Sequence, residues 1–226
     1  MQGEGHLMVN DVSMTLAAKA PDERRRRILA AAIAVLRERG FSGTRVADIA
    51  STAGTSPALV LYHFSSLADV LVAALQSVED EYYADLDKDR PADPCDQLVR
   101  MAVLSAEGGP AFGDWQLWIE VWVRGLHDDR IDDLRRLSDT RWRDEIRGVV
   151  DAGTTSGQFT VDDPARTTLR MACLMDGLAV QTVLGGAGLR PEDMATEWLI
   201  GCAHELGVDP ELLLQRATAI AGPSGA

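Results

Sequence analysis

The chain has 226 residues, of which 46% are apolar and 25% charged, as in an ordinary soluble globular protein. No apolar run approaches the roughly 18 to 20 residues that a membrane-spanning helix needs. Residues 1–20 lack the basic start and continuous apolar core of a secretion signal. Cys95, Cys173 and Cys202 are scattered, with no CxxC pair and no histidine at ligand spacing. This pattern argues against a disulfide framework or a metal site and favours a reducing cytoplasm, and nothing in it calls for a cofactor.

The net charge of −13 is distributed unevenly along the chain. Residues 1–70 hold eight basic and seven acidic side chains, so they carry +1 and the remainder carries −14. Such asymmetry between the two parts of a chain points to nucleic-acid contact by one of them. The alternative is that the acidic surface only keeps the protein in solution.

Helical periodicity dominates the chain and no convincing alternating strand pattern occurs, so we predict an all-α fold. We expect residues 1–20 to form a mobile tail. The first helix should run from about Asp22 to Arg39 and end at Gly40, which is a typical helix C-terminal residue. Its buried stripe consists of Ile28, Ala31, Ala32, Val35 and Leu36.

Two short helices are predicted next, over 44–53 and 56–64, with Gly54 between them. Thr44 is suited to cap the first, and Ser56 followed by Pro57 is a typical start for the second. The stretch from Ser66 to Asp69 resembles a capping box and opens a longer helix to about residue 87.

The remaining sequence is divided by glycines, prolines and acidic turns into six further predicted helices. They cover residues 95–107, 112–126, 131–153, 163–185, 191–206 and 210–220. We therefore expect a DNA-binding head over 21–66 and a larger helical body over 67–226.

The two short helices have the form of a helix-turn-helix, in which the second helix enters the major groove. Thr44 and Arg45 lie at a helix N-terminus, which favours a phosphate. Tyr62 and His63 offer hydrogen-bond donors to the DNA backbone. The start of the second helix carries small or apolar residues that suit close approach and contact with thymine methyl groups. These residues are Ser56, Pro57, Ala58 and Leu59.

This part of the chain strongly resembles the tetracycline-repressor (TetR) family. The resemblance is carried by Gly40-Phe41, by the run from Thr44 to Ala50, and by the run from Ala53 to Phe64, and it is specific over about residues 22–75. It implies a three-helix DNA-binding head, a long fourth helix, and a ligand-binding body that dimerises through its last two long helices. It also implies repression, and phosphate contacts by Thr44, Arg45, Tyr62 and His63.

Two residues depart from the family pattern in the head. Leu61 stands where a tyrosine is usual, with Tyr62 one place later, and Leu67 stands where a lysine is usual. Both replacements remove phosphate contacts. We expect modest DNA affinity, or compensation either by the arginines at 24–27 or by the N-terminal tail with Lys19.

The body is similar, more loosely, to TetR-family regulators with a choline-regulator-like C-terminal domain. The similarity rests on the run from Leu117 to Trp122, on Gly157-Gln158-Phe159, and on Asp176-Gly177-Leu178 followed by Gln181.

Three tryptophans, Trp115, Trp118 and Trp122, share one helix face by their spacing. With further large side chains they are candidates to line an apolar cavity for a small apolar or amphipathic ligand. The additional candidates are Met101, Trp142, Met171 and Met175. The alternative for each residue alone is that it belongs to the core.

The predicted helix over 163–185 is apolar almost all round, which indicates burial on every side and, in a protein of this size, a subunit interface. Gly177 in its middle costs about 1 kcal/mol relative to alanine, which fits the close approach of a partner backbone. Candidate interface residues are Leu174, Gly177, Leu178, Trp198 and Cys202. A symmetric homodimer would place two recognition helices about 34 to 36 Å apart, on a palindromic double-stranded operator.

Two other functions compete with a ligand-released repressor. The run from Asp128 to Asp132 matches the DDxxD spacing of metal-dependent prenyl-transferring enzymes, but no second aspartate-rich motif accompanies it. Acidic residues at a helix N-terminus are the simpler interpretation, so we expect no enzyme. An all-α protein-interaction module is the other alternative, and it leaves the pattern over 44–64 unexplained.

Overall fold

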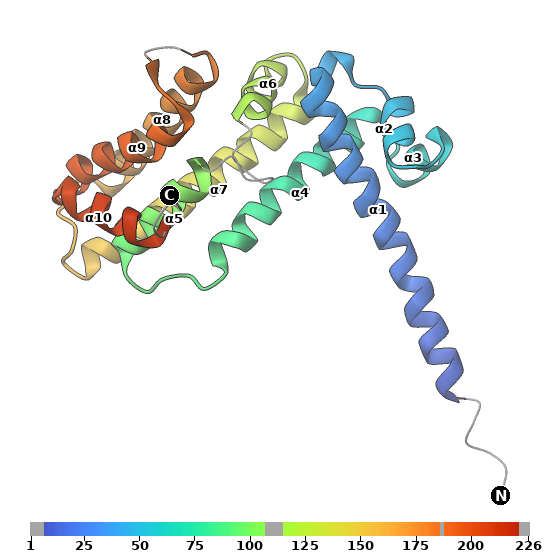
Figure 1. Ribbon diagram of the computed structural model, residues 1–226, viewed down its shortest axis with the longest axis horizontal. Helices are drawn as coiled ribbons and strands as arrows, with labels where there is room; N and C mark the ends of the chain where they lie inside the picture. Colours follow the sequence, from blue (N-terminus) through green and yellow to red (C-terminus); the bar gives the residue numbers. More distant parts are fainter. Residues whose placement is uncertain (1–6, 107–114, 186–187, 222–226) are drawn as a thin grey trace, which may run out of the picture. The chain divides into compact units, whose positions relative to one another are not determined.

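The computed structural model describes residues 7–106, 115–185 and 188–221, which form ten helices and no strand (Figure 1). The predicted all-α fold is confirmed. Among these residues no single helix is long and apolar enough to cross a membrane, and only a bent pair of helices, Pro57–His63 with Leu67–Asp87, meets that criterion jointly. The chain divides into two compact units, Met1–Ser77 and Val78–Ala226.

The first unit contains α1 (Leu7–Gly43), α2 (Val46–Thr52), α3 (Pro57–His63) and the beginning of α4 (Leu67–Asp87). α2 packs against both α1 and α3. The buried apolar side chains recur at helical spacing along α1 and α4, as the sequence pattern requires. They include Ile28, Ala32 and Leu36 on α1 and Val70 and Leu75 on α4, and Ile49 on α2 and Val60 on α3 are buried with them.

The first helix ends where the sequence predicts and begins earlier. Gly40 has φ 66° and ψ 177°, a conformation that suits glycine and interrupts the helix. The backbone is helical back to Leu7, so it differs from the expected tail over residues 7–20, and residues 1–6 lie outside the described part. The helix passes through Pro21, a residue without a backbone N–H donor.

The second unit contains the end of α4 and six further helices. α8 packs against α9, α7 and α6, while α5 packs against α7, α9 and α10. The six predicted helices are all present, with most ends shifted by a few residues, while the predicted end at 107 and the predicted start at 112 lie outside the described residues. Their bounds are α5 (Pro94–Ala106), α6 (Trp115–Gly125), α7 (Asp129–Thr155), α8 (Pro164–Val183), α9 (Pro191–Leu206) and α10 (Pro210–Ala221).

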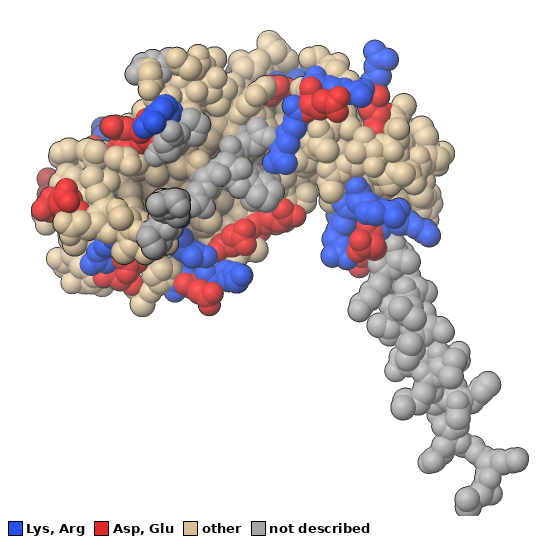
Figure 2. Space-filling model, viewed as in Figure 1, with Lys and Arg blue, Asp and Glu red and all other residues tan. Residues whose placement is uncertain are grey.

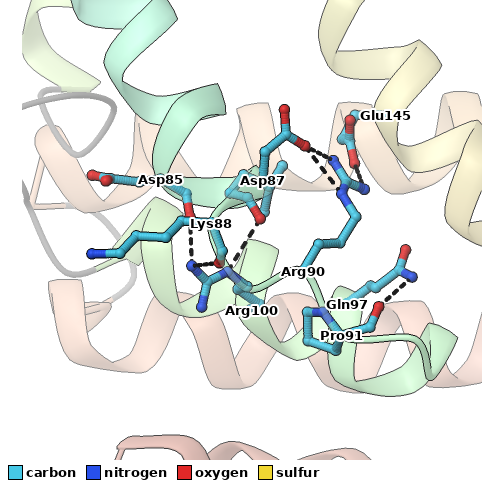
Figure 3. A network of polar contacts seen from close by, with 9 residues as sticks. Asp85, Asp87, Lys88, Arg90, Pro91, Gln97, Arg100 and Glu145 are labelled. Carbon is cyan, nitrogen blue, oxygen red and sulfur yellow. Dashed lines mark hydrogen bonds and ion pairs between the residues drawn. The ribbon is translucent and has the colours of Figure 1, made fainter.

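The C-terminal end of α4 is fixed by a network of arginines (Figure 3). The guanidinium of Arg100 on α5 donates to the carbonyl oxygens of Asp85 and Lys88, at 2.5 and 2.7 Å. Helix-terminal carbonyls lack partners within the helix, so this arginine completes their hydrogen bonding. Arg90, just after α4, pairs with Glu145 on α7. The division into two compact units falls inside α4, between Ser77 and Val78, and the functional boundary at residues 66 and 67 stays a prediction.

Candidate DNA-binding surface and ligand cavity

The helix-turn-helix is built by a glycine turn and a serine cap. Gly54 has φ 62°, which allows the chain to reverse between α2 and α3. Ser56 caps α3 as predicted, because its hydroxyl accepts a hydrogen bond from the Leu59 amide at 3.2 Å. Pro57 and Ala58 are exposed at the start of α3. The small side chains that the sequence assigned to the base edges therefore lie on an open surface.

The end of α3 carries the polar side chains that the sequence assigned to the DNA backbone. Tyr62 is 82% exposed, and its ring meets the edge of His63 with the centroids 5.5 Å apart. The neighbouring Leu61 is also exposed, although it is apolar. The tyrosine hydroxyl is accessible to a phosphate oxygen.

Thr44 does not occupy the position that the sequence predicted. Its side chain is only 3% exposed, and its hydroxyl donates to the Gly40 carbonyl at 2.7 Å. The residue that precedes α2 as N-cap is Arg45, and no side-chain cap is present there. Thr44 therefore holds the turn after α1, and its single hydroxyl hydrogen is not available to a phosphate, whereas the Arg45 side chain is exposed.

The four consecutive arginines at 24–27 on α1 are all exposed. Figure 2 shows basic and acidic side chains close together on several parts of the surface, so such arginines have acidic neighbours. Arg26 pairs with Glu23 on the same helix. The Arg25 guanidinium lies 5.1 Å from the centroid of the Phe64 ring, at the end of α3. This cation–π contact joins these arginines to the recognition helix.

One cavity of the second unit brings the predicted tryptophans together. Three come from α6 and one from α7, and the other described lining residues are polar. The lining residues are Trp115, Trp118, Trp122, Ser138, Asp139, Trp142 and Asp176. Met101, Met171 and Met175, which the sequence grouped with the tryptophans, are fully buried core residues and do not line this cavity.

The tryptophan rings are held by the helices behind them. The Trp115 indole donates to the Ser105 carbonyl at 3.0 Å. Trp142 packs against Tyr82 and Trp198, with ring centroids 6.3 and 6.2 Å apart. Trp115 and Trp142 are therefore held by contacts outside the cavity.

The tryptophan cavity is small and shares part of its wall with a larger hollow. It has a volume of about 20 Å³, which is room for one water molecule. The adjoining open hollow measures about 480 Å³, and Val123, Leu126 and Arg135 contribute to its wall. Both are bordered by Trp122, by Asp139 and by Asp176, so these side chains separate the closed space from the open one. Trp122 is half-buried, unlike the other three tryptophans.

Two carboxylates face the cavity and differ in their partners. Asp139 accepts a hydrogen bond from Arg135 at 2.5 Å, and burial raises the pKa of its carboxyl. Burial also raises the pKa of Asp176 to about 6, with Asp139 adding to the shift and Arg143 opposing it. No other described residue forms a hydrogen bond or ion pair with Asp176. Its charge, when present, is therefore open to the cavity.

Sequence reasoning did not place Ser138, Asp139 and Asp176 in the cavity. Asp176 was noted only as part of a family-like motif, and the other two lie in a helix whose polar residues give no local signal. Their convergence depends on the packing of α6, α7 and α8 against one another.

The α8 helix leaves one face open in the single chain, so it is not buried on every side. Leu169, Cys173, Gly177 and Leu184 are exposed on this face, Leu184 by 72%. A side chain built at Gly177 would meet no atom of the chain within 4 Å. The close approach that the sequence analysis invoked at this glycine is therefore not made inside one protomer.

Three of the other residues predicted for a dimer interface are occupied within the chain. Trp198 and Cys202 are fully buried, because α9 packs against both α8 and α5. Leu174 packs on α9, where its Cδ2 atom lies 2.2 Å from the position that a side chain at Gly201 would take. Leu178 is half-buried. An interface on this side would use the outward residues of α8.

The DDxxD-like run is used structurally. Asp128 caps α7 by accepting from the Arg130 amide, and Asp132 pairs with Arg135 and Arg136, which lower the pKa of its carboxyl. Across the described ranges no three metal-ligating side chains converge.

The comparisons with known proteins agree along most of the chain. Residues 28–74 match the family of bacterial regulatory proteins called the tetR family, and residues 94–199 match the C-terminal region of BetI-type transcriptional repressors. The HTH-type transcriptional regulator BetI of Ectopseudomonas mendocina is 26% identical over 177 residues, which cover 75% of this chain and 86% of that protein.

Solved structures give the same assignment. A transcriptional regulator from Saccharomonospora viridis, in complex with choline, is 31% identical with a TM-score of 0.72, over 78% of this chain and 94% of that one. A TetR-family regulator from Rhodococcus sp. is 26% identical with a TM-score of 0.72, over 82% of this chain and 99% of that one. Proteins of this kind bind DNA operators and small-molecule ligands and form dimers. The chain belongs to the TetR family of DNA-binding transcriptional regulators and has the C-terminal region of a BetI-type repressor.

Proposed function

We propose that this protein is a homodimeric repressor that a small quaternary ammonium compound releases from a palindromic operator. The observation that carries the proposal is the cavity of four tryptophans and two carboxylates between α6, α7 and α8. This replaces the apolar or amphipathic ligand expected from the sequence with a cationic one.

Indole faces attract an organic cation through the ring quadrupole, by about 0.5–1 kcal/mol when exposed and about 2 kcal/mol or more when desolvated. A quaternary ammonium group donates no hydrogen bonds, so it loses little on leaving water for an aromatic cavity. Asp176 supplies the balancing negative charge close to the rings. Choline in the related regulator from Saccharomonospora viridis supports this chemical class.

Ligand entry requires the cavity to enlarge, since about 20 Å³ cannot hold an ammonium compound. Trp122 stands between the closed cavity and the open hollow and is the least buried of the four rings. We expect it to move outward as the ligand enters. The ligand would then favour a different packing of α6 from that of the free protein, which is what release from DNA requires.

DNA binding is assigned to the exposed surface of α3 and its flanks. Pro57 and Ala58 would approach the bases, while Arg45 and Tyr62 would contact phosphate groups. The open face of α8 around Gly177 would pair with a second copy and so set the distance between two half-sites, about 34 to 36 Å. A repressor acts where the chromosome is, so we place the protein in the cytoplasm.

We propose no catalytic activity. Asp128 and Asp132 resemble a metal-binding motif only in sequence, since a helix cap and two arginines engage their carboxylates.

A gel-shift experiment with the DNA that flanks the gene of this protein tests the proposal. We expect a specific shift that weakens with salt and is reversed by choline. The matched control ligand is 3,3-dimethylbutan-1-ol, which has the shape of choline without the charge and should not reverse the shift. Equal release by both compounds would contradict the cationic site, and failure to bind any member of a random operator library would contradict the repressor.

A further inference from the structure

Ser138 on α7 lines the tryptophan cavity, and it is the residue with a hydroxyl group among the described lining residues, which otherwise carry indoles and carboxylates. The side chain is buried. Its Oγ atom lies 2.9 Å from Oε2 of Glu79, a residue of α4. The cavity is therefore one hydrogen bond away from the helix that begins in the DNA-binding unit.

Glu79 is 3% exposed and is held by this serine. No described residue forms a hydrogen bond with its Oε1 atom. Burial raises the pKa of Glu79, and the Ser138 hydrogen bond and the charge of Arg141 lower it again. A buried carboxylate with an unmatched oxygen is costly and calls for an explanation. Glu79 acts on the cavity wall through Ser138, because its carboxylate holds the serine hydroxyl group.

The direction of the hydrogen bond follows from the chemistry of the two groups. An ionised carboxylate only accepts, so Ser138 donates its single hydroxyl hydrogen to Glu79. The lone pairs of the Ser138 oxygen then remain able to accept a hydrogen bond from a group in the cavity. The wall presents a hydrogen-bond acceptor at this point, and it would accept from a hydroxyl group of a ligand.

Two neighbouring residues of α7 also contact α4. Arg141 pairs with Asp80 at 2.9 Å and lies 3.8 Å over the Tyr83 ring. The cavity residue Trp142 packs against Tyr82. Beyond this contact the end of α4 is fixed by Arg90 and Arg100 (Figure 3). A displacement of Ser138 or Trp142 therefore acts on a helix whose far end is anchored.

We infer that Ser138 accepts a hydrogen bond from a hydroxyl group of the cationic ligand, and that Glu79 on α4 fixes the serine in this orientation. The hydroxyl group of the ligand is then the part that is coupled to α4. This inference rests on the proposed function and deepens it. Glu79 is a positioning residue, because it acts on the ligand only through the serine.

The two cavity carboxylates are less suited to this hydroxyl. Asp139 is already engaged by Arg135. Asp176 is the carboxylate without a partner among the described side chains, and the ammonium group needs it as a counter-charge. Among the described lining residues, Ser138 is therefore the neutral group that can accept a hydrogen bond from the ligand hydroxyl.

Calorimetry on the full-length protein tests this with two probes, choline and propyltrimethylammonium, which carry a hydroxyl and a methyl group at the same position. For the wild type we expect choline to bind about three- to tenfold more tightly, the value of one hydrogen bond. Ser138→Ala should bring the two affinities to within a factor of two. Ser105→Ala is the matched control, since Ser105 is buried and bonded to Tyr82 but does not line the cavity. The Ser105→Ala variant should keep the wild-type preference for choline over propyltrimethylammonium.

Glu79→Gln provides a second variant that keeps the serine. Glutamine can donate to Ser138 as well as accept, so the serine is no longer fixed and the preference for choline should fall. The readout for α4 is operator release with both probes at saturation. Choline should release more DNA than propyltrimethylammonium from the wild-type protein. The two compounds should release equal amounts of DNA from Ser138→Ala.

The outcomes separate this inference from the function on which it rests. If both probes bind the wild type equally, or if Ser138→Ala keeps the preference, the inference is wrong while the ammonium site stands. If the preference disappears in Asp176→Asn and persists in Ser138→Ala, the hydroxyl binds the aspartate. If neither probe binds, the proposed function fails and the inference with it.

Discussion

The DNA-binding surface and the ligand cavity are built in opposite ways. The residues assigned to DNA lie within a short stretch of sequence, just before α2 and along α3, and they are mostly exposed. The cavity residues come from α6, α7 and α8, and most are buried. Substitutions on the DNA-binding surface should therefore change the affinity for DNA without changing the stability of the fold. Substitutions in the cavity act on packing as well, so they need isosteric replacements or a control ligand.

The open face of α8 belongs to neither site, but we expect the largest effect there. In Gly177→Glu a charged side chain would be placed where we expect a second copy to approach, without a clash inside the protomer. We predict monomers in analytical ultracentrifugation. Operator affinity should fall at least about 100-fold, because a monomer binds one half-site and loses the gain that a dimer obtains from binding both at once.

Two observations make this prediction specific to an interface. Gly177→Ala adds only a methyl group and should dimerise better than the glutamate variant. Cys173 is exposed on the same face, whereas Cys95 and Cys202 are buried, so its alkylation rate reports on the interface. We expect slow alkylation in the dimer and fast alkylation in Gly177→Glu. A dimer that survives the glutamate would place the interface elsewhere.

Asp176→Asn tests the electrostatic part of the cavity. The substitution keeps the shape and removes the charge that no other described residue engages. We predict a loss of about 30-fold in choline affinity, or about 2 kcal/mol, by tryptophan fluorescence titration. The thermal midpoint without ligand should not fall, because the carboxylate is unfavourably buried. Unchanged choline affinity would remove Asp176 from the site.

Sequence patterns sufficed for the parts of the molecule that depend on local chemistry. Ser56 and Ser66 were correctly assigned as caps, and Gly40 as the end of the first helix. Thr44 was misplaced because a threonine near a helix start can cap that helix or bond back to the preceding turn, and sequence does not distinguish these. Trp115, Trp118 and Trp122 were grouped from their spacing and Trp142 was added as a further large side chain, and all four line one cavity. The cavity carboxylates were missed, because only tertiary packing turns polar residues of α7 and α8 towards the rings.

Tyr62→Ala and Arg45→Ala test the DNA-binding surface with a smaller effect. Both side chains are exposed and serve no other element, so folding should be unaffected. We expect operator affinity to fall about tenfold in each variant, similarly across operator sequences, because phosphate contacts carry no base preference. For Arg45→Ala the slope of log affinity against log salt should also become less negative, since a phosphate charge is no longer neutralised.

Leu61→Ala is the neighbouring control for these variants, since it removes an exposed apolar side chain without a phosphate donor. Its salt dependence should match that of the wild type. A loss confined to particular operator bases in Tyr62→Ala would mean that this tyrosine reads sequence instead of the backbone.

The pH dependence of ligand binding should show the smallest effect. The pKa of Asp176 in the free protein is about 6, because burial and Asp139 outweigh Arg143. A bound cation favours the ionised form, so choline and a proton compete. Lowering the pH from 7 to 5.5 should weaken choline binding about fourfold, as expected from the protonated fraction. Asp176→Asn should bind choline weakly and independently of pH over this interval.

The stability of the ligand-free protein should respond to pH in the opposite sense, since it should increase as the pH falls. The folded pKa of Asp176 is raised above its ordinary value of 3.8, so the folded protein holds this proton more firmly than the unfolded chain does. The stabilising contribution is therefore complete below about pH 4 and is lost as the pH rises through about 6. Denaturation of the wild type relative to Asp176→Asn across this range isolates the contribution. A difference that is flat with pH would mean that water reaches Asp176 freely, and the cavity would then lack the dry aromatic environment on which cation recognition depends.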